Sequence, residues 1–167
     1  MAYLLDANVF IQAKRLHYGM DFCPAFWDWL CDQNQTGKVF SIEKVADELA
    51  AGDDDLRTWA VQRGSEFFLP PDQGMLTSLT TVGQWVQSQS FRPVAVSTFL
   101  QDADYYLIAH ALAHGHMVVT HEVASDGVRQ VKIPNVCIGV RVKCITPFAM
   151  LRLERARFVL DGKSGMA

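Results

Sequence analysis

The chain has 167 residues, a formal net charge of −3, and 50% hydrophobic and 20% charged residues. This composition is typical of one ordinary globular domain with a sizeable core. It excludes a strongly basic nucleic-acid-binding protein, although an acidic pocket that binds divalent cations can still meet a phosphate. No apolar run in the sequence reaches the length of about 18 residues that a membrane span needs, so we expect no membrane association.

The cysteines give no sign of a disulfide framework or a zinc site. Cys23, Cys31, Cys137 and Cys144 form no CxxC pair and have no metal-ligand spacing. They are expected to serve as small hydrophobic residues in a reduced, cytoplasmic protein.

The first half of the chain alternates short apolar runs with helical patterns. Strands are expected at residues 3–5, 38–40 and 67–69, and the stretch after Asn8 can form a helix. Pro24 is placed to open a helix that ends at the "NQTG" segment. Two more helices are expected, one from Ser41 to about Gly52 and one over residues 53–63 with Gly64 at its end.

The second half continues the alternation. Amphipathic spacing predicts a helix over residues 75–86, and residues 87–98 are expected to be the loosest stretch. The segment "DADYYLIAHALAH" predicts a helix over residues 102–114 that Gly115 closes. A strand at residues 117–120, a loop over 122–131, a last strand at 137–140 and a final helix over 147–157 complete the pattern.

Strands that alternate with helices predict a parallel sheet covered on both faces. We therefore expect the fold class α/β, with a three-layer α/β/α arrangement and a mostly parallel sheet of four to five strands. One domain is expected over residues 1–160, followed by a disordered tail at residues 161–167.

Acidic residues fall where such a sheet binds ligands, at the carboxyl ends of its strands. Asp6 follows the first strand, and Glu122 follows the strand "MVVT". Glu48 lies in the helix after the second strand. Asp104 lies in the first turn of the helix 102–114, in line with its apolar stripe, so its carboxylate points at the protein and needs a partner there.

Each of these acids also has a simpler explanation when taken alone. Asp6 can cap a helix, Glu48 can be a solvated helix residue, Asp104 can favour the helix dipole, and Glu122 can be an ordinary loop residue. Together, however, four converging carboxylates repel one another and require cations. Oxygen ligands of this kind suit Mg²⁺ or Mn²⁺.

His110 and His114 are spaced as zinc ligands on a helix can be. The segment "HALAH" nevertheless lacks the glutamate of a metalloprotease motif. A histidine beside a C-capping glycine is also favourable for the helix dipole alone, so no zinc site is expected here.

Three segments, "LLDANVFI", "VADEL" and "DADYYLIAHALAHGHMVVTHE", resemble the PIN-domain ribonucleases. The resemblance runs from Leu4 to about Phe158, and the segment from Tyr18 to Trp29 is similar to an uncharacterised bacterial branch of PIN-like proteins. It implies a metal site that is built from Asp6, Glu48, Asp104 and Glu122 and supported by Asn8 and Thr120.

The same resemblance implies a divalent-metal-dependent endoribonuclease that hydrolyses RNA. Members of this kind are often toxins paired with a small antitoxin protein, and they often form homodimers. The resemblance also decides between neighbouring acids, because the family pattern favours Asp104 over Asp102 and Glu48 over Glu43.

The chain departs from the family at Glu122, where Asp is the commoner residue. This departure supports an alternative in which a PIN-like fold has lost catalysis and acts as an RNA-binding or protein-interaction module. A receiver-like signalling domain ranks lower, because only Asp6 follows the first strand and no lysine stands near Thr120.

Overall fold

The computed structural model describes residues 1–52 and 54–160. These residues form an α/β fold around one five-stranded sheet, in which every strand is parallel to its neighbours and the order is β3-β2-β1-β4-β5. The strands are β1 (Tyr3–Leu5), β2 (Val39–Ile42), β3 (Phe68–Leu69), β4 (Met117–Val119) and β5 (Cys144–Ile145). The expected three-layer α/β/α arrangement with a parallel sheet is confirmed.

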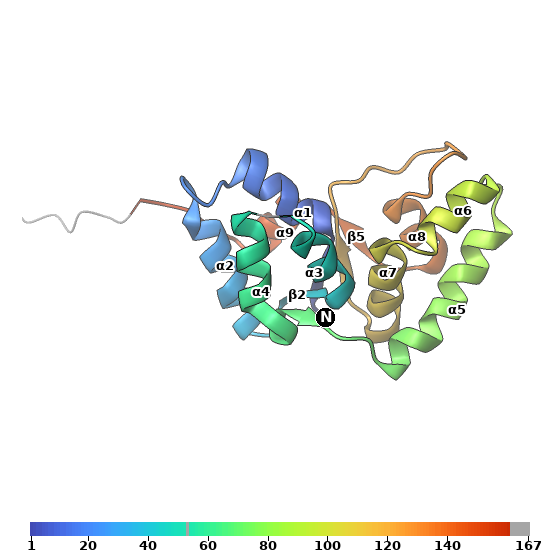
Figure 1. Cartoon of the computed structure of the whole chain (residues 1–167), viewed down its shortest axis with the longest axis horizontal. Coiled ribbons are helices and arrows are strands. Elements are labelled where there is room, and N and C mark those ends of the chain that lie inside the picture. The colour runs from blue at the N-terminus through green and yellow to red at the C-terminus, as the bar shows by residue number, and fades with distance from the viewer. Residues whose placement is uncertain (53, 161–167) are drawn as a thin grey trace, which may run out of the picture.

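Helices cover both faces of the sheet. In Figure 1, α2 and α4 lie on one side of it and α7 and α8 lie on the other, with α5 packed outside α7. The helices in the described part of the chain are α1 (Ala7–Gln12), α2 (Pro24–Gln35), α3 (Glu43–Ala50), α4 (Asp55–Phe67), α5 (Gln73–Ser88), α6 (Pro93–Phe99), α7 (Ala103–His114), α8 (Ile133–Val140) and α9 (Pro147–Leu153). A π-helical turn, η1 (Ala13–His17), continues α1.

The central strands are buried, as a parallel sheet requires. Leu4 and Leu5 of β1 and Val118 and Val119 of β4 have no exposed surface. A strand with helices on both faces has a continuous apolar sequence, which is why these strands could be recognised in the sequence.

Helix ends follow local side-chain chemistry. The Asp72 side chain caps α5 by accepting a hydrogen bond of 2.8 Å from the Met75 N–H. Thr146 caps α9 in the same way, through the Ala149 N–H. Gly115 ends α7 in the left-handed conformation, with φ 67°, as its position in the sequence predicts.

Two expectations about elements were wrong. Residues 137–140 belong to helix α8 rather than to a strand, and the last strand is β5. The stretch expected to be loose contains helix α6, which begins at Pro93. Proline at the first turn favours a helix start, and the same residue type opens α8 at Pro134.

Two helix ends also differ from expectation. Gly64 has φ 60° and kinks α4, but the helix continues to Phe67. The final helix α9 ends at Leu153, four residues before the expected end at 157. The tail expected at residues 161–167 lies outside the described residues. In the described part of the chain, no helix is long and apolar enough to cross a membrane.

Candidate metal centre at the carboxyl ends of the strands

The strand order reverses direction at β1 and β4. The chain builds the sheet outward from β1 through β2 to β3, and then returns to place β4 on the other side of β1. In open parallel sheets, ligands bind in the crevice at such a reversal, outside the carboxyl ends of the strands. Asp6 follows β1 directly, Thr120 follows β4 directly, and the Asp6 N–H donates to the Val119 carbonyl at 3.0 Å.

The Thr120 hydroxyl group joins the two strand ends. It donates to Asp6 Oδ2 at 2.8 Å and accepts from Asn8 Nδ2 at 3.2 Å and from the Glu122 N–H at 3.1 Å. Asn8 Oδ1 also accepts from the His121 N–H at 3.1 Å. Asn8 and Thr120 therefore stand where they orient the acidic side chains.

Asp6 is almost fully buried, with 4% of its surface exposed. It occupies the N-cap position of α1 but makes no capping hydrogen bond, so helix capping does not explain it. Burial raises the pKa of Asp6 to about 7, and the negative charges of Glu122 and Glu48 add to this rise. The hydrogen bond from Thr120 acts in the opposite direction.

Asp104 lies half-buried in the first turn of α7, within reach of the charge of Asp6. Burial raises its pKa to about 8, followed by the negative charges of Asp6, Glu122, Asp102 and Glu48. The pKa of Asp104 is thus raised by the charge of every other acid that the sequence predicts for this site. The structure brings the four acids into one electrostatic cluster, which we call the acidic cluster.

Glu48 lies on the solvent side of the acidic cluster, near the end of α3. Its pKa is raised by partial desolvation and then by the charge of Asp102. Glu48 also lines a hollow of about 150 Å³ together with Lys14 and Arg15. Within the described residues, no three of the four carboxylates come within 4.8 Å of one another, so they form an open arrangement rather than a closed cage.

Glu122 differs from Glu48 and Asp104 because protein groups already contact both oxygens of its carboxylate. Its Oε2 accepts from the Ile133 N–H at 2.7 Å, and its Oε1 lies 3.6 Å from Lys132 Nζ. Both contacts come from the start of α8, so Glu122 ties the loop after β4 to that helix.

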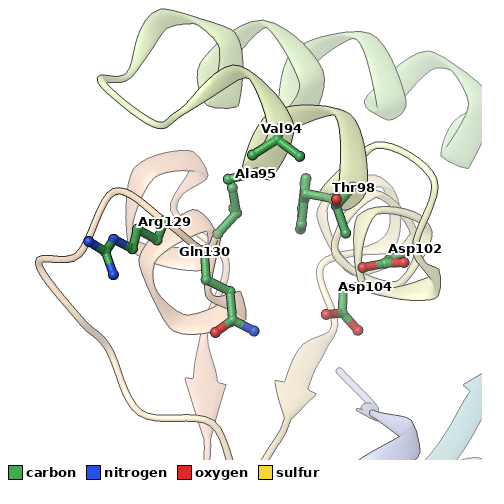
Figure 2. A pocket seen from close by; sticks show the side chains of 9 residues that line it. Val94, Ala95, Thr98, Asp102, Asp104, Arg129 and Gln130 are labelled. Atoms are coloured by element: carbon green, nitrogen blue, oxygen red, sulfur yellow. The ribbon is translucent and has the colours of Figure 1, made fainter.

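Asp102 adds its charge to that of the acidic cluster, although the resemblance favours Asp104 over Asp102. Its charge raises the pKa of both Glu48 and Asp104. Asp102 and Asp104 line a hollow of about 170 Å³ beneath α6 (Figure 2), with Arg129 and Gln130 across from them. In this view the Arg129 guanidinium points away from the two acids.

Several residues beside the site could not be identified from the sequence. Lys14 and Arg15 come from the turn η1, and Arg129 comes from the loop after β4. His17, also in η1, lies with its ring 5.5 Å from that of His121. None of them belongs to a motif with a recognisable spacing, and only the folded chain shows their proximity.

The donor set suits a hard divalent cation. Among the described residues, no lysine, arginine or histidine forms an ion pair with Asp6, Glu48 or Asp104. Buried carboxylates without such partners are costly, and carboxylate oxygens are the ligands that Mg²⁺ and Mn²⁺ prefer. Asp6 and Asp104 would be the most direct ligands, and Glu48 could ligate from the open side.

Comparison with known proteins gives one family. Searches among curated proteins and among solved structures returned no match to the chain. A family model described as "Domain of unknown function (DUF4411)" matches residues 3–158, which include every strand of the sheet and all residues of the acidic cluster. The chain therefore belongs to the DUF4411 family.

Proposed function

We propose that the protein is a divalent-metal-dependent endoribonuclease. The observation that carries the proposal is the pair Asp6 and Asp104, two carboxyl groups without cationic partners among the described residues, at the reversal of strand order. With pKa values of about 7 and 8, both carboxyl groups hold a proton for much of the time near neutral pH, and a bound cation would take the place of these protons. The resemblance of the sequence to PIN-domain ribonucleases supports the same proposal.

Each residue of the site would have a separate role in phosphodiester hydrolysis. Bound Mg²⁺ or Mn²⁺ would supply activation of a water molecule and neutralisation of charge on the phosphate. Asp6 and Asp104 would bind the cation, and Thr120 and Asn8 keep Asp6 in position through the hydrogen bonds described above. Glu48 could orient the attacking water from the open side.

Basic side chains on both flanks suit an RNA backbone. Lys14 and Arg15 share the hollow that Glu48 lines, and Arg129 stands at the rim of the hollow that Asp104 lines. Such side chains contact phosphates without reading sequence. A single-stranded segment of RNA is the preferred substrate, because an unpaired strand can approach the open side of the acidic cluster. The resemblance further suggests a toxin role with an antitoxin partner, and a homodimer.

The test is RNA cleavage in Mn²⁺, with EDTA as the negative control. Asp104→Asn keeps the shape of the side chain and removes its charge, so we expect a loss of about 10²-fold or more in rate. Asp28→Asn on the surface of α2 is the matched control and should cleave like the wild type. Wild-type cleavage that survives EDTA, or full activity in Asp104→Asn, would rule out the proposed site.

The second candidate is an inactive module that binds RNA or protein. The contacts of Glu122 with Lys132 and the Ile133 N–H favour it, because they occupy a carboxylate that the nuclease would use. Glu122→Asp separates the two. A gain in rate supports the nuclease, whereas wild type that binds varied RNAs without cleaving any of them supports the module.

A further inference from the structure

A second cluster of ligating side chains lies at the far end of α7. Asp72, His110 and His114 each offer one ligand atom, and these atoms all lie within 4.8 Å of one another. Because an α-helix rises about 1.5 Å per residue, His110 and His114 lie about 9 Å and about 15 Å along the axis from Asp104. This cluster is therefore separate from the acidic cluster.

Two helices bring the three side chains together. Asp72 caps the start of α5, while His110 and His114 lie one turn apart at the end of α7. His114 Nε2 lies 2.7 Å from Asp72 Oδ2, and the rings of the two histidines lie 4.7 Å apart. Asp72 Oδ1 is occupied by the Met75 N–H, so its carboxylate is held in place while Oδ2 faces the histidines.

His110 carries the second, independent observation. Its side chain is 97% buried, since only 3% of its surface is exposed, and its Nδ1 has no hydrogen-bond partner within the described residues. Buried polar groups are nearly always partnered, so an unpartnered ring nitrogen calls for an explanation. A neutral imidazole has one lone pair, which can bind a metal ion.

No zinc site is expected from the sequence alone, because "HALAH" lacks the glutamate of a metalloprotease motif and His114 stands beside a C-capping glycine. The third ligand comes from Asp72, which is 38 positions before His110 and belongs to another helix. His116 lies beside the cluster with its ring 5.8 Å from that of His114, but its Nδ1 accepts a hydrogen bond from the Ala2 N–H.

We propose that Asp72, His110 and His114 bind one Zn²⁺ ion that fastens the start of α5 to the end of α7. Two imidazoles and one carboxylate suit Zn²⁺, with water as the fourth ligand, and do not suit Mg²⁺. Zinc bonds of about 2.0–2.1 Å bring ligand atoms to about 3.4 Å from one another. Small rotations of Asp72 and His114, both exposed to solvent, achieve this closure.

The test is calorimetric titration of the EDTA-treated, dialysed protein with Zn²⁺. One ion should bind per chain, and Co²⁺ in its place should give the absorption spectrum of a site with nitrogen ligands. His114→Gln and Asp72→Asn should each weaken Zn²⁺ binding by at least about tenfold. Asparagine also caps helices well, so Asp72→Asn removes the anionic ligand while α5 keeps its cap.

Two control variants locate the ion. His17→Gln removes a histidine from the pair with His121 and should leave Zn²⁺ affinity unchanged. Asp104→Asn should also leave it unchanged, which distinguishes this site from the acidic cluster. Absence of a 1:1 Zn²⁺ complex, or wild-type affinity in either ligand variant that folds, would overturn the proposal.

Discussion

The Thr120 hydroxyl group forms hydrogen bonds with three neighbouring residues. Replacing it in Thr120→Val keeps the shape and removes the donor to Asp6 and the acceptor for Asn8 and Glu122. We expect the free energy of unfolding to fall by about 1–3 kcal/mol, because buried polar groups lose their partner. Urea denaturation measures this loss.

Thr120→Ser is the matched control, because it keeps the hydroxyl group and loses only a methyl group. It should retain most of the hydrogen bonding and stay closer to the wild type. If the serine and valine variants are equally unstable, packing of the methyl group rather than the hydroxyl network holds the strand ends together.

Asp104 makes stability depend on pH in a defined direction. Its pKa is raised to about 8 in the folded protein from about 3.9 in the unfolded chain, so between these values the folded state binds more protons. Its contribution is therefore present at low pH and is lost as pH rises toward 8. In EDTA, the Tm of the wild type should fall relative to that of Asp104→Asn between pH 5 and pH 8.

The comparison with the variant is needed because other groups act in the opposite direction. Burial lowers the pKa of His110, His116 and His121, and these rings favour stability as pH rises. They are present in both proteins, so their effect cancels in the difference. A difference of 1 kcal/mol corresponds to about 2–4 °C in a chain of this size, which scanning calorimetry resolves. If the Tm of the wild type and that of Asp104→Asn change with pH in parallel, the pKa of Asp104 is not raised in the folded protein.

Residues at the strand ends could be predicted, whereas those on the flanks could not. Parallel strands end at one edge of the sheet, so Asp6 and the residues after "VVT" had to be neighbours once the strands were recognised. The positions of Lys14 and Arg129 depend on the path of a turn and of a loop, which no periodicity describes. The contacts that hold Glu122 could not be predicted, because the sequence pattern indicates a strand at residues 137–140 and no helix that begins beside Lys132.

At the scale of elements, α8 shows why short apolar segments are ambiguous. The run "IPNVCIGV" has the length and the apolar character of a buried strand, and periodicity does not distinguish the two structures. The deciding features are Pro134 in the first turn and the left-handed cap at Arg141, with φ 61°. Long helices such as α5 and α7 can be distinguished from strands by their length.

The packing of α8 on α5 depends on Gly139. A Cβ atom added there would lie 2.0 Å from Cε2 of Trp85, which is far inside van der Waals contact. We expect Gly139→Ala to lower the free energy of unfolding by about 1–3 kcal/mol from overpacking, although alanine is the better helix former. Guanidinium denaturation measures the change.

Combination with Trp85→Leu provides the control. The smaller side chain removes the ring atoms that the new methyl group would meet, so Gly139→Ala should cost little in that background. A double-mutant cycle gives the coupling between the two positions. Additive effects of the two substitutions would mean that contact with Trp85 does not determine which side chain fits at position 139.

For the whole molecule, the proposed functions predict two independent responses to metal ions. Mn²⁺ should raise the Tm, because its binding to the folded acidic cluster adds about 2.7 kcal/mol to the free energy of unfolding at 100 times Kd. Asp6→Asn should reduce this shift. Differential scanning fluorimetry with Mn²⁺, Zn²⁺ and both ions together measures it.

The shifts from the two ions should add, because the sites lie too far apart to share ligands. The variant His114→Gln should lose the response to Zn²⁺ and keep the response to Mn²⁺. If each variant loses both responses, one site rather than two binds the ions.

The position of β1 in the middle of the sheet also determines when the acidic cluster can form during synthesis. Strand β1 pairs with β2 early, but its other edge pairs with β4, whose residues 117–119 emerge more than 100 positions later. Until then that edge stays open, and Asp6 lacks the hydroxyl group of Thr120. A nascent or truncated chain that ends before β4 therefore carries no assembled site, so any activity of the acidic cluster begins only after Thr120 and Glu122 have been made.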